Sequence, residues 1–137
     1  MPSLAAIRFS ALLAEHTGQL THFVELLKRE QELLAEGRIE ALLELAADKT
    51  AAVRQLQDAE NTRALALASD GVEATAQGIA AFVEREGDAL SEAWQRYLAL
   101  AREANELNLI SGKLVRQQMQ NNQLALNVLL ASPEIPL

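Results

Sequence analysis

Few residues of this chain are spaced in a way that could support chemistry, and the clearest are two cations on one predicted helix. Lys49 and Arg63 both fall on its apolar stripe. Two such cations inside a helical bundle can clamp the carboxylates of a dianionic substrate. Glu60 lies one turn from Arg63, and Glu30 lies on the stripe of the preceding helix, so the same charges can instead pair and fix helix register. We expect ion pairs, and keep a small helical enzyme using Lys49 and Arg63 as an alternative.

The two histidines do not form a metal-binding pair. His16 and His22 are six residues apart, which places them on different faces of a helix. We expect His16 to lie on the apolar stripe with a hydrogen bond, and His22 to lie on the surface. The sequence contains no cysteine, no glycine-rich phosphate loop and no Ser-His-Asp arrangement. It therefore predicts a protein that is not an enzyme and that has no cofactor or metal site.

The composition favours helices throughout. Half of the 137 residues are hydrophobic but only 4% are aromatic, and alanine and leucine, both strong helix formers, dominate. Proline occurs only at positions 2, 133 and 136, so no strong helix breaker lies between the termini. The net charge of −7 disfavours nucleic acid as a partner. Residues 1–10 lack the basic region and apolar core of a signal peptide, and no apolar run approaches the roughly 18–20 residues of a membrane span, so we expect a cytoplasmic protein without membrane insertion.

The fold class follows from the lengths of the periodic segments. We expect an all-α protein, an elongated antiparallel helical bundle of three long helices plus one short helix, with coiled-coil-like packing. The long helices are predicted at residues 4–35, 38–68 and 88–131.

Local signals mark the helix ends. Gly37 is expected to end the first helix in a left-handed conformation. Asp70 and Glu73 resemble a capping box that begins the short helix. We treat the chain as one domain in four parts: an antiparallel hairpin (1–68), a short helix with its connections (69–87), the long helix (88–131) and a tail (132–137).

The longest predicted helix carries a stripe whose members are spaced alternately by four and three residues. We call it the amide stripe, because amides and a glycine interrupt its apolar residues. Buried amides without partners cost about 1–3 kcal/mol each, so we expect neighbouring helices, water or another chain to satisfy them. Its members are Trp94, Leu98, Ala101, Asn105, Asn108, Gly112, Val115, Met119, Asn122, Leu126 and Leu129.

The second half of this helix has an unusual charge distribution. Residues 107–133 contain no acidic residue, and their only charges are Lys113 and Arg116. Because charged residues are depleted at interface cores, we expect this segment to contact a partner.

The same helix resembles the FlgN family of flagellar type III export chaperones. The resemblance rests on Trp94, then Asn105 and Asn108 in an Asn-x-x-Asn pattern, then Gly112, followed by an amide-rich stretch that ends in leucines. Ser111 stands where the family usually has asparagine before the glycine. Weaker similarity extends over nearly the whole chain, except for residues 69–90.

The resemblance implies a chaperone for hook–filament junction proteins, also called hook-associated proteins. It implies that the C-terminal helix binds these clients, and that the chaperone keeps them competent for secretion and delivers them to the flagellar export apparatus. The amide stripe is then divided at Gly112 into a half that packs within the bundle and a half that binds the client. Apolar contacts are expected from Leu114, Val115, Met119, Leu126 and Leu129, with register set by Asn105, Asn108 and Asn122. The alternative from another class is a coiled-coil adaptor that self-associates, as a homodimer for example, through the same stripe.

Overall fold

The chain forms four helices and no strand within residues 1–131, which are the residues that the computed structural model describes. Within them, the side chains of Ala125, Leu129 and Ala131 are not described. The expected all-α bundle of three long helices and one short helix is confirmed. The helices are α1 (Leu4–Glu36), α2 (Ile39–Ser69), α3 (Ala76–Glu86) and α4 (Asp88–Ala131).

Capping residues set the helix ends, and one prediction about them is wrong. Gly37 ends α1 with φ 67°, and its N–H reaches the carbonyls of the last turn, as expected. The start of α3 was expected at an Asp70–Glu73 capping box. Instead Asp70 ends α2 and binds Arg8 at 3.1 Å. The cap of α3 is Thr75, whose hydroxyl accepts a hydrogen bond from the amide of Gly78.

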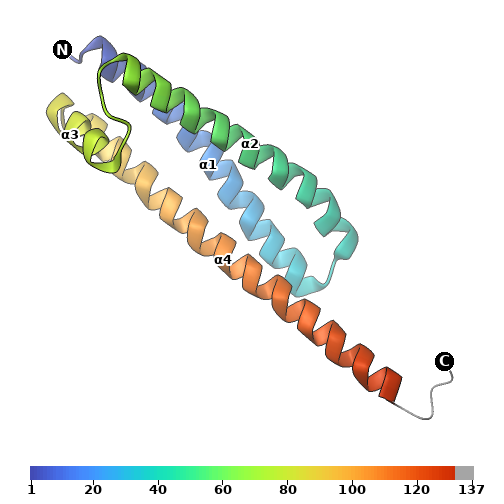
Figure 1. The fold of residues 1–137 in the computed structure, drawn as a ribbon. Helices are drawn as coiled ribbons and strands as arrows, with labels where there is room; N and C mark the ends of the chain where they lie inside the picture. Colours follow the sequence, from blue (N-terminus) through green and yellow to red (C-terminus); the bar gives the residue numbers. More distant parts are fainter. Residues whose placement is uncertain (132–137) are drawn as a thin grey trace.

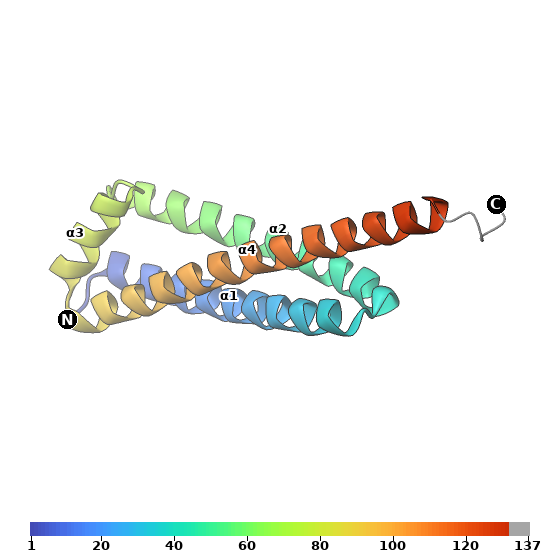
Figure 2. The ribbon, with the colours of Figure 1, turned by 90° about the horizontal axis from the view of Figure 1, so that it is seen from below.

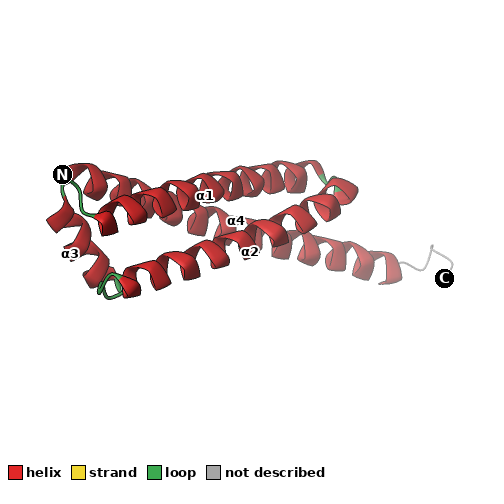
Figure 3. Cartoon of the chain, turned by 90° about the horizontal axis from the view of Figure 1, so that it is seen from above, coloured by secondary structure: helices red, strands yellow, loops and turns green. Residues whose placement is uncertain are grey.

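The helix α1 is the centre of the molecule. It packs along α2 on one side and along α4 on the other, whereas α2 and α4 have no comparable backbone packing with each other within residues 1–131. Figures 1 and 2 show the consequence, an elongated open arrangement in which α3 crosses one end. Because α3 returns the chain to the end where α1 starts, α4 runs parallel to α1 and antiparallel to α2 (Figure 3).

The apolar core is divided along the long axis into two clusters. Near the α3 end, Phe9 contacts Phe82 edge-on at 5.6 Å and Trp94 at 5.8 Å between ring centroids. Towards the α1–α2 turn, aliphatic side chains around the fully buried Leu27 form the second cluster, with Ala52 from α2 and Ala104 from α4. Both clusters depend on α1, so most of the packing that holds α4 in place is with this one helix and with α3.

Candidate functional site

A buried polar cluster joins α1, α2 and α4 near the middle of the bundle. Arg63 is only 7% exposed, and its guanidinium lies over the rings of Trp94 and Tyr97, 5.0 and 4.9 Å from their centroids. Arg63 Nη1 is 3.1 Å from His16 Nδ1, and His16 Nε2 is 3.3 Å from the Tyr97 hydroxyl. Arg63 of α2 thus contacts α4 through two aromatic faces and α1 through one imidazole.

The chemistry of the cluster specifies the protonation of His16. A guanidinium can only donate, so Nδ1 of His16 accepts from Arg63, and the neutral ring carries its proton on Nε2. This proton is then available to the Tyr97 oxygen. Burial, and secondarily the charge of Arg63, lower the pKa of His16 from 6.5 to about 4. The predicted stripe position of His16 and surface position of His22 are both confirmed.

The charges predicted to pair do so only in part. Lys49 Nζ lies 3.1 Å from Glu30 Oε1, and this half-buried ion pair joins α2 to α1 as expected. Glu60 is exposed, and Arg63 has His16 rather than Glu60 as its partner. Lys49 and Arg63 are 14 residues apart on one helix, which is about 21 Å along the axis. They do not converge on one ligand.

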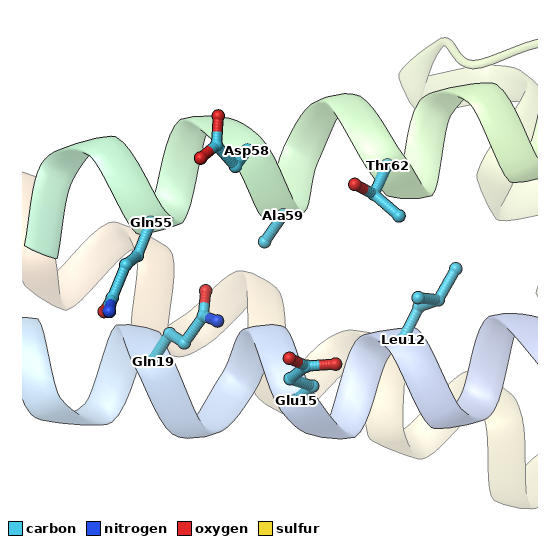
Figure 4. A pocket seen from close by; sticks show the side chains of 7 residues that line it. All are labelled: Leu12, Glu15, Gln19, Gln55, Asp58, Ala59 and Thr62. Carbon is cyan, nitrogen blue, oxygen red and sulfur yellow. The ribbon is translucent and has the colours of Figure 1, made fainter.

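A cavity of about 250 Å³ lies between α1 and α2, lined by Leu12, Glu15, Gln19, Gln55, Asp58, Ala59 and Thr62 (Figure 4). The lining includes neither Lys49 nor Arg63, and offers carboxylates, amides and a hydroxyl but no cationic side chain. The cavity therefore does not complete the clamp that the enzyme alternative needs.

The amide stripe is buried only at its start, which corrects the expectation of a buried seam. Trp94 is buried, and Leu98 and Ala101 are half-buried. From Asn105 onward the stripe is exposed except at the half-buried Gly112, so Asn105, Asn108, Val115, Met119, Asn122 and Leu126 all face solvent. The amides incur no burial cost, because water satisfies them. Leu129 keeps its place in α4, but its side chain lies outside the described residues.

A neighbouring stripe shares the contact with α1 and continues it where the amide stripe faces solvent. From Tyr97 onward, each of its members lies one residue before a member of the amide stripe. The members are the buried Leu90, Ala104 and Ser111 and the half-buried Tyr97, Leu107 and Leu114. The spacing is the same, but these side chains are mostly apolar or small and can be buried without stranding amides. The predicted client-binding residue Leu114 therefore belongs at least partly to the bundle.

The contact between α4 and the hairpin ends near Gln118. Its side-chain amide donates to the Leu34 carbonyl at 3.3 Å, three residues before the α1–α2 turn. Beyond this point α4 continues past the hairpin (Figure 1). The boundary between the packed and free parts of α4 thus lies at about residue 118, and not at Gly112, where a Cβ atom would meet only the end of the Arg116 side chain at 3.5 Å.

Sequence reasoning missed the second apolar side of this free segment. Leu124 and Val128 are 62% and 70% exposed, and each lies two residues from Leu126, about 200° around the helix. Leu130 and Ile110 are exposed as well. A search for apolar residues at a single helical spacing identifies only one side of a helix. A helical segment that is apolar on two sides is typical of a helix enclosed by other protein surfaces.

The chain resembles known proteins in both sequence and fold. A family model described as FlgN protein matches residues 1–135. The chain belongs to the FlgN family. A crystal structure from Pseudomonas aeruginosa, of a protein proposed to be the flagella synthesis protein FlgN, has the same fold with a TM-score of 0.71. The two sequences are 23% identical, and the matched region covers 92% of this chain and 98% of the Pseudomonas aeruginosa chain. No curated protein matches the chain.

Membership of the FlgN family confirms the resemblance read from the sequence and supports a flagellum-related role. FlgN is a family of flagellar export chaperones and not of enzymes. None of the described helices is long and apolar enough to cross a membrane.

Proposed function

We propose that this chain is a cytoplasmic flagellar export chaperone for hook–filament junction proteins. It keeps these clients competent for secretion and delivers them to the flagellar type III export apparatus. The observation that carries the proposal is the C-terminal part of α4, which extends beyond the hairpin with apolar side chains in solvent and no acidic residue from position 107 to 133. Clustered exposed apolar side chains without acidic neighbours are typical of a protein-binding surface.

The uncovered part of the amide stripe is the client surface in this proposal. Val115, Met119 and Leu126 are 40%, 66% and 47% exposed and lie on one side of α4 as apolar anchors. An amphipathic helix of the client lies along them, in the manner of helix-in-groove recognition. Leu129 is added to this set by helical spacing alone, and Leu114 contributes from the edge of the bundle.

The exposed amides give the surface its register. Asn105, Asn108 and Asn122 lie on the same stripe and offer both donors and acceptors to a client backbone or side chain. The space beside them is available because α2 reaches α4 through Arg63 but does not pack along it. Exposed Ile39 and Leu43 on the first turns of α2 add apolar surface at the same end of the molecule.

Calorimetric titration with a purified hook-associated protein tests the proposal. We expect deletion of residues 117–137 to abolish binding, and Met119→Asp or Leu126→Asp each to weaken it by about tenfold or more, because a buried apolar side chain becomes a charge. Gln120→Asp is the matched control, since it adds the same charge to an exposed position of the same helix, at least 100° around the axis from Met119 and Leu126. Undiminished binding after the deletion contradicts the assignment.

A further inference from the structure

The outer side of α4, away from the amide stripe, has its own exposed residues. We define the outer stripe as Ala89, Ala93, Arg96, Glu103, Glu106, Ile110, Lys113, Gln117, Leu124 and Val128. Six of these are spaced by sevens from Ala89 to Leu124, so they lie on one side of a supercoiled helix. Every member is exposed except Ala93, which is half-buried. The outer stripe has apolar residues at both ends and in the middle.

At its N-terminal end the outer stripe borders a groove between α1 and α4. Two adjoining hollows of about 500 and 410 Å³ share Ser10 and Ala14 of α1. Their floor consists largely of small side chains, including Ala89 and Ala93 of α4, so a helix can approach closely. At the C-terminal end the stripe carries the large, exposed Leu124 and Val128. One end thus offers holes and the other offers side chains to fill them.

We propose that a second copy of this chain occupies the groove, forming an antiparallel dimer through the outer stripes of the two α4 helices. If Leu124 of one copy packs against Ala93 of the other, and Val128 against Ala89, both pairs place the twofold axis between Asn108 and Leu109. The two pairs share one axis because Leu124 and Val128 have the same four-residue spacing as Ala89 and Ala93, and this arrangement is compatible with a closed, isologous dimer. The same symmetry brings the two copies of the exposed Ile110 together near the axis.

Charge favours the antiparallel direction. Residues 88–106 carry four carboxylates and two arginines, a net charge of −2, whereas residues 107–131 carry only Lys113 and Arg116, a net charge of +2. An antiparallel pair sets each positive half against the negative half of the other copy, and a parallel pair sets like against like. Lys113 falls one residue from the position opposite Glu103 of the second copy. Within residues 1–131, Lys113 has no ion-pair partner, and Glu103 has only the exposed Lys28 at 3.5 Å.

The dimer is independent of the proposed client surface, because the outer stripe and the amide stripe lie on nearly opposite sides of α4. Leu124 and Leu126 are two residues apart and about 200° around the helix. A client helix on the amide stripe and a second copy on the outer stripe therefore enclose the free segment from both sides. This accounts for the presence of apolar side chains on both sides of the segment.

Sedimentation velocity of the full chain over a range of concentrations, without client, is the first test. We expect a species with twice the mass of one chain, and we expect Leu124→Asp to weaken dimerisation by about a hundredfold or more, since each dimer loses two buried leucines. Leu126→Asp is the matched control and leaves the dimer unchanged. Lys113→Glu weakens the dimer, and adding Glu103→Lys restores it. A wild-type monomer at every concentration, or equal loss in the two aspartate variants, overturns the proposal.

Cross-linking supplies the geometry, because the chain has no native cysteine. We expect a short bifunctional maleimide to join a chain carrying Leu124→Cys to a chain carrying Ala93→Cys, and not to join Leu126→Cys to Ala93→Cys. Equal yields for the two mixtures overturn the antiparallel arrangement. Client binding is measured separately on the same variants. Loss of client binding in Leu126→Asp with an intact dimer, and the reverse in Leu124→Asp, separate the two surfaces.

Discussion

Stability should depend on pH through the buried His16. The folded chain holds this imidazole neutral, because protonation would place a second cation against Arg63 and remove the acceptor that Arg63 uses. The pKa is lowered to about 4 in the folded state, against 6.5 for an unperturbed histidine. Between these values the unfolded chain binds a proton that the folded chain does not. The full contribution of His16 is therefore present above pH 6.5 and is lost progressively as the pH falls towards 4.

The magnitude follows from the two pKa values. At 1.36 kcal/mol for each tenfold difference in proton affinity, the free energy of unfolding falls by about 3 kcal/mol at most across this range. Such a loss is large against the stability of a small domain, which is typically about 5–15 kcal/mol.

Urea denaturation followed by circular dichroism, repeated between pH 6.5 and 4, measures the effect. Many carboxylates titrate near the lower limit, so the informative quantity is the difference between the wild type and His16→Gln, which cannot take up the proton. We expect the variant to be less stable at neutral pH and the difference to narrow as the pH falls. His22→Gln, at an exposed position of the same helix, should keep the wild-type dependence. Parallel curves for wild type and His16→Gln would refute the reasoning.

The remaining predictions concern glycines and an ion pair, all measured by urea denaturation. Gly112→Ala should stabilise the chain by about 1 kcal/mol, because the site is open and alanine favours the helix; destabilisation would show that the glycine is needed. Gly78→Ala should destabilise it, because the new Cβ would collide with the backbone carbonyl of Glu73; a gain would contradict that contact. Lys49→Met should cost about 1–2 kcal/mol by leaving Glu30 half-buried without its partner, and adding Glu30→Leu should recover most of the loss; no recovery would refute this account.

Local features of the structure were predictable residue by residue. The bounds of the long helices agree with expectation to within about one residue, because helix hydrogen bonds are local and Gly37 supplies a strong stop. The start of α3 was not predictable in the same way. Asp70 could have capped the helix, but it binds Arg8, 62 residues away in sequence, and the role passes to Thr75. A contact between distant residues here overrides a short-range pattern.

The sequence by itself determined the helices, the acid-free second half of α4 and the residues that mark the FlgN family. Only the tertiary structure decided which side of α4 is buried. Two stripes one residue apart have the same spacing, and α1 selects the one that buries Ala104 and Ser111 and leaves Asn105 and Asn108 in water. No local sequence pattern predicts that Arg63 pairs with His16, or that α4 leaves the hairpin near Gln118. Both depend on where three helices meet and where one of them ends.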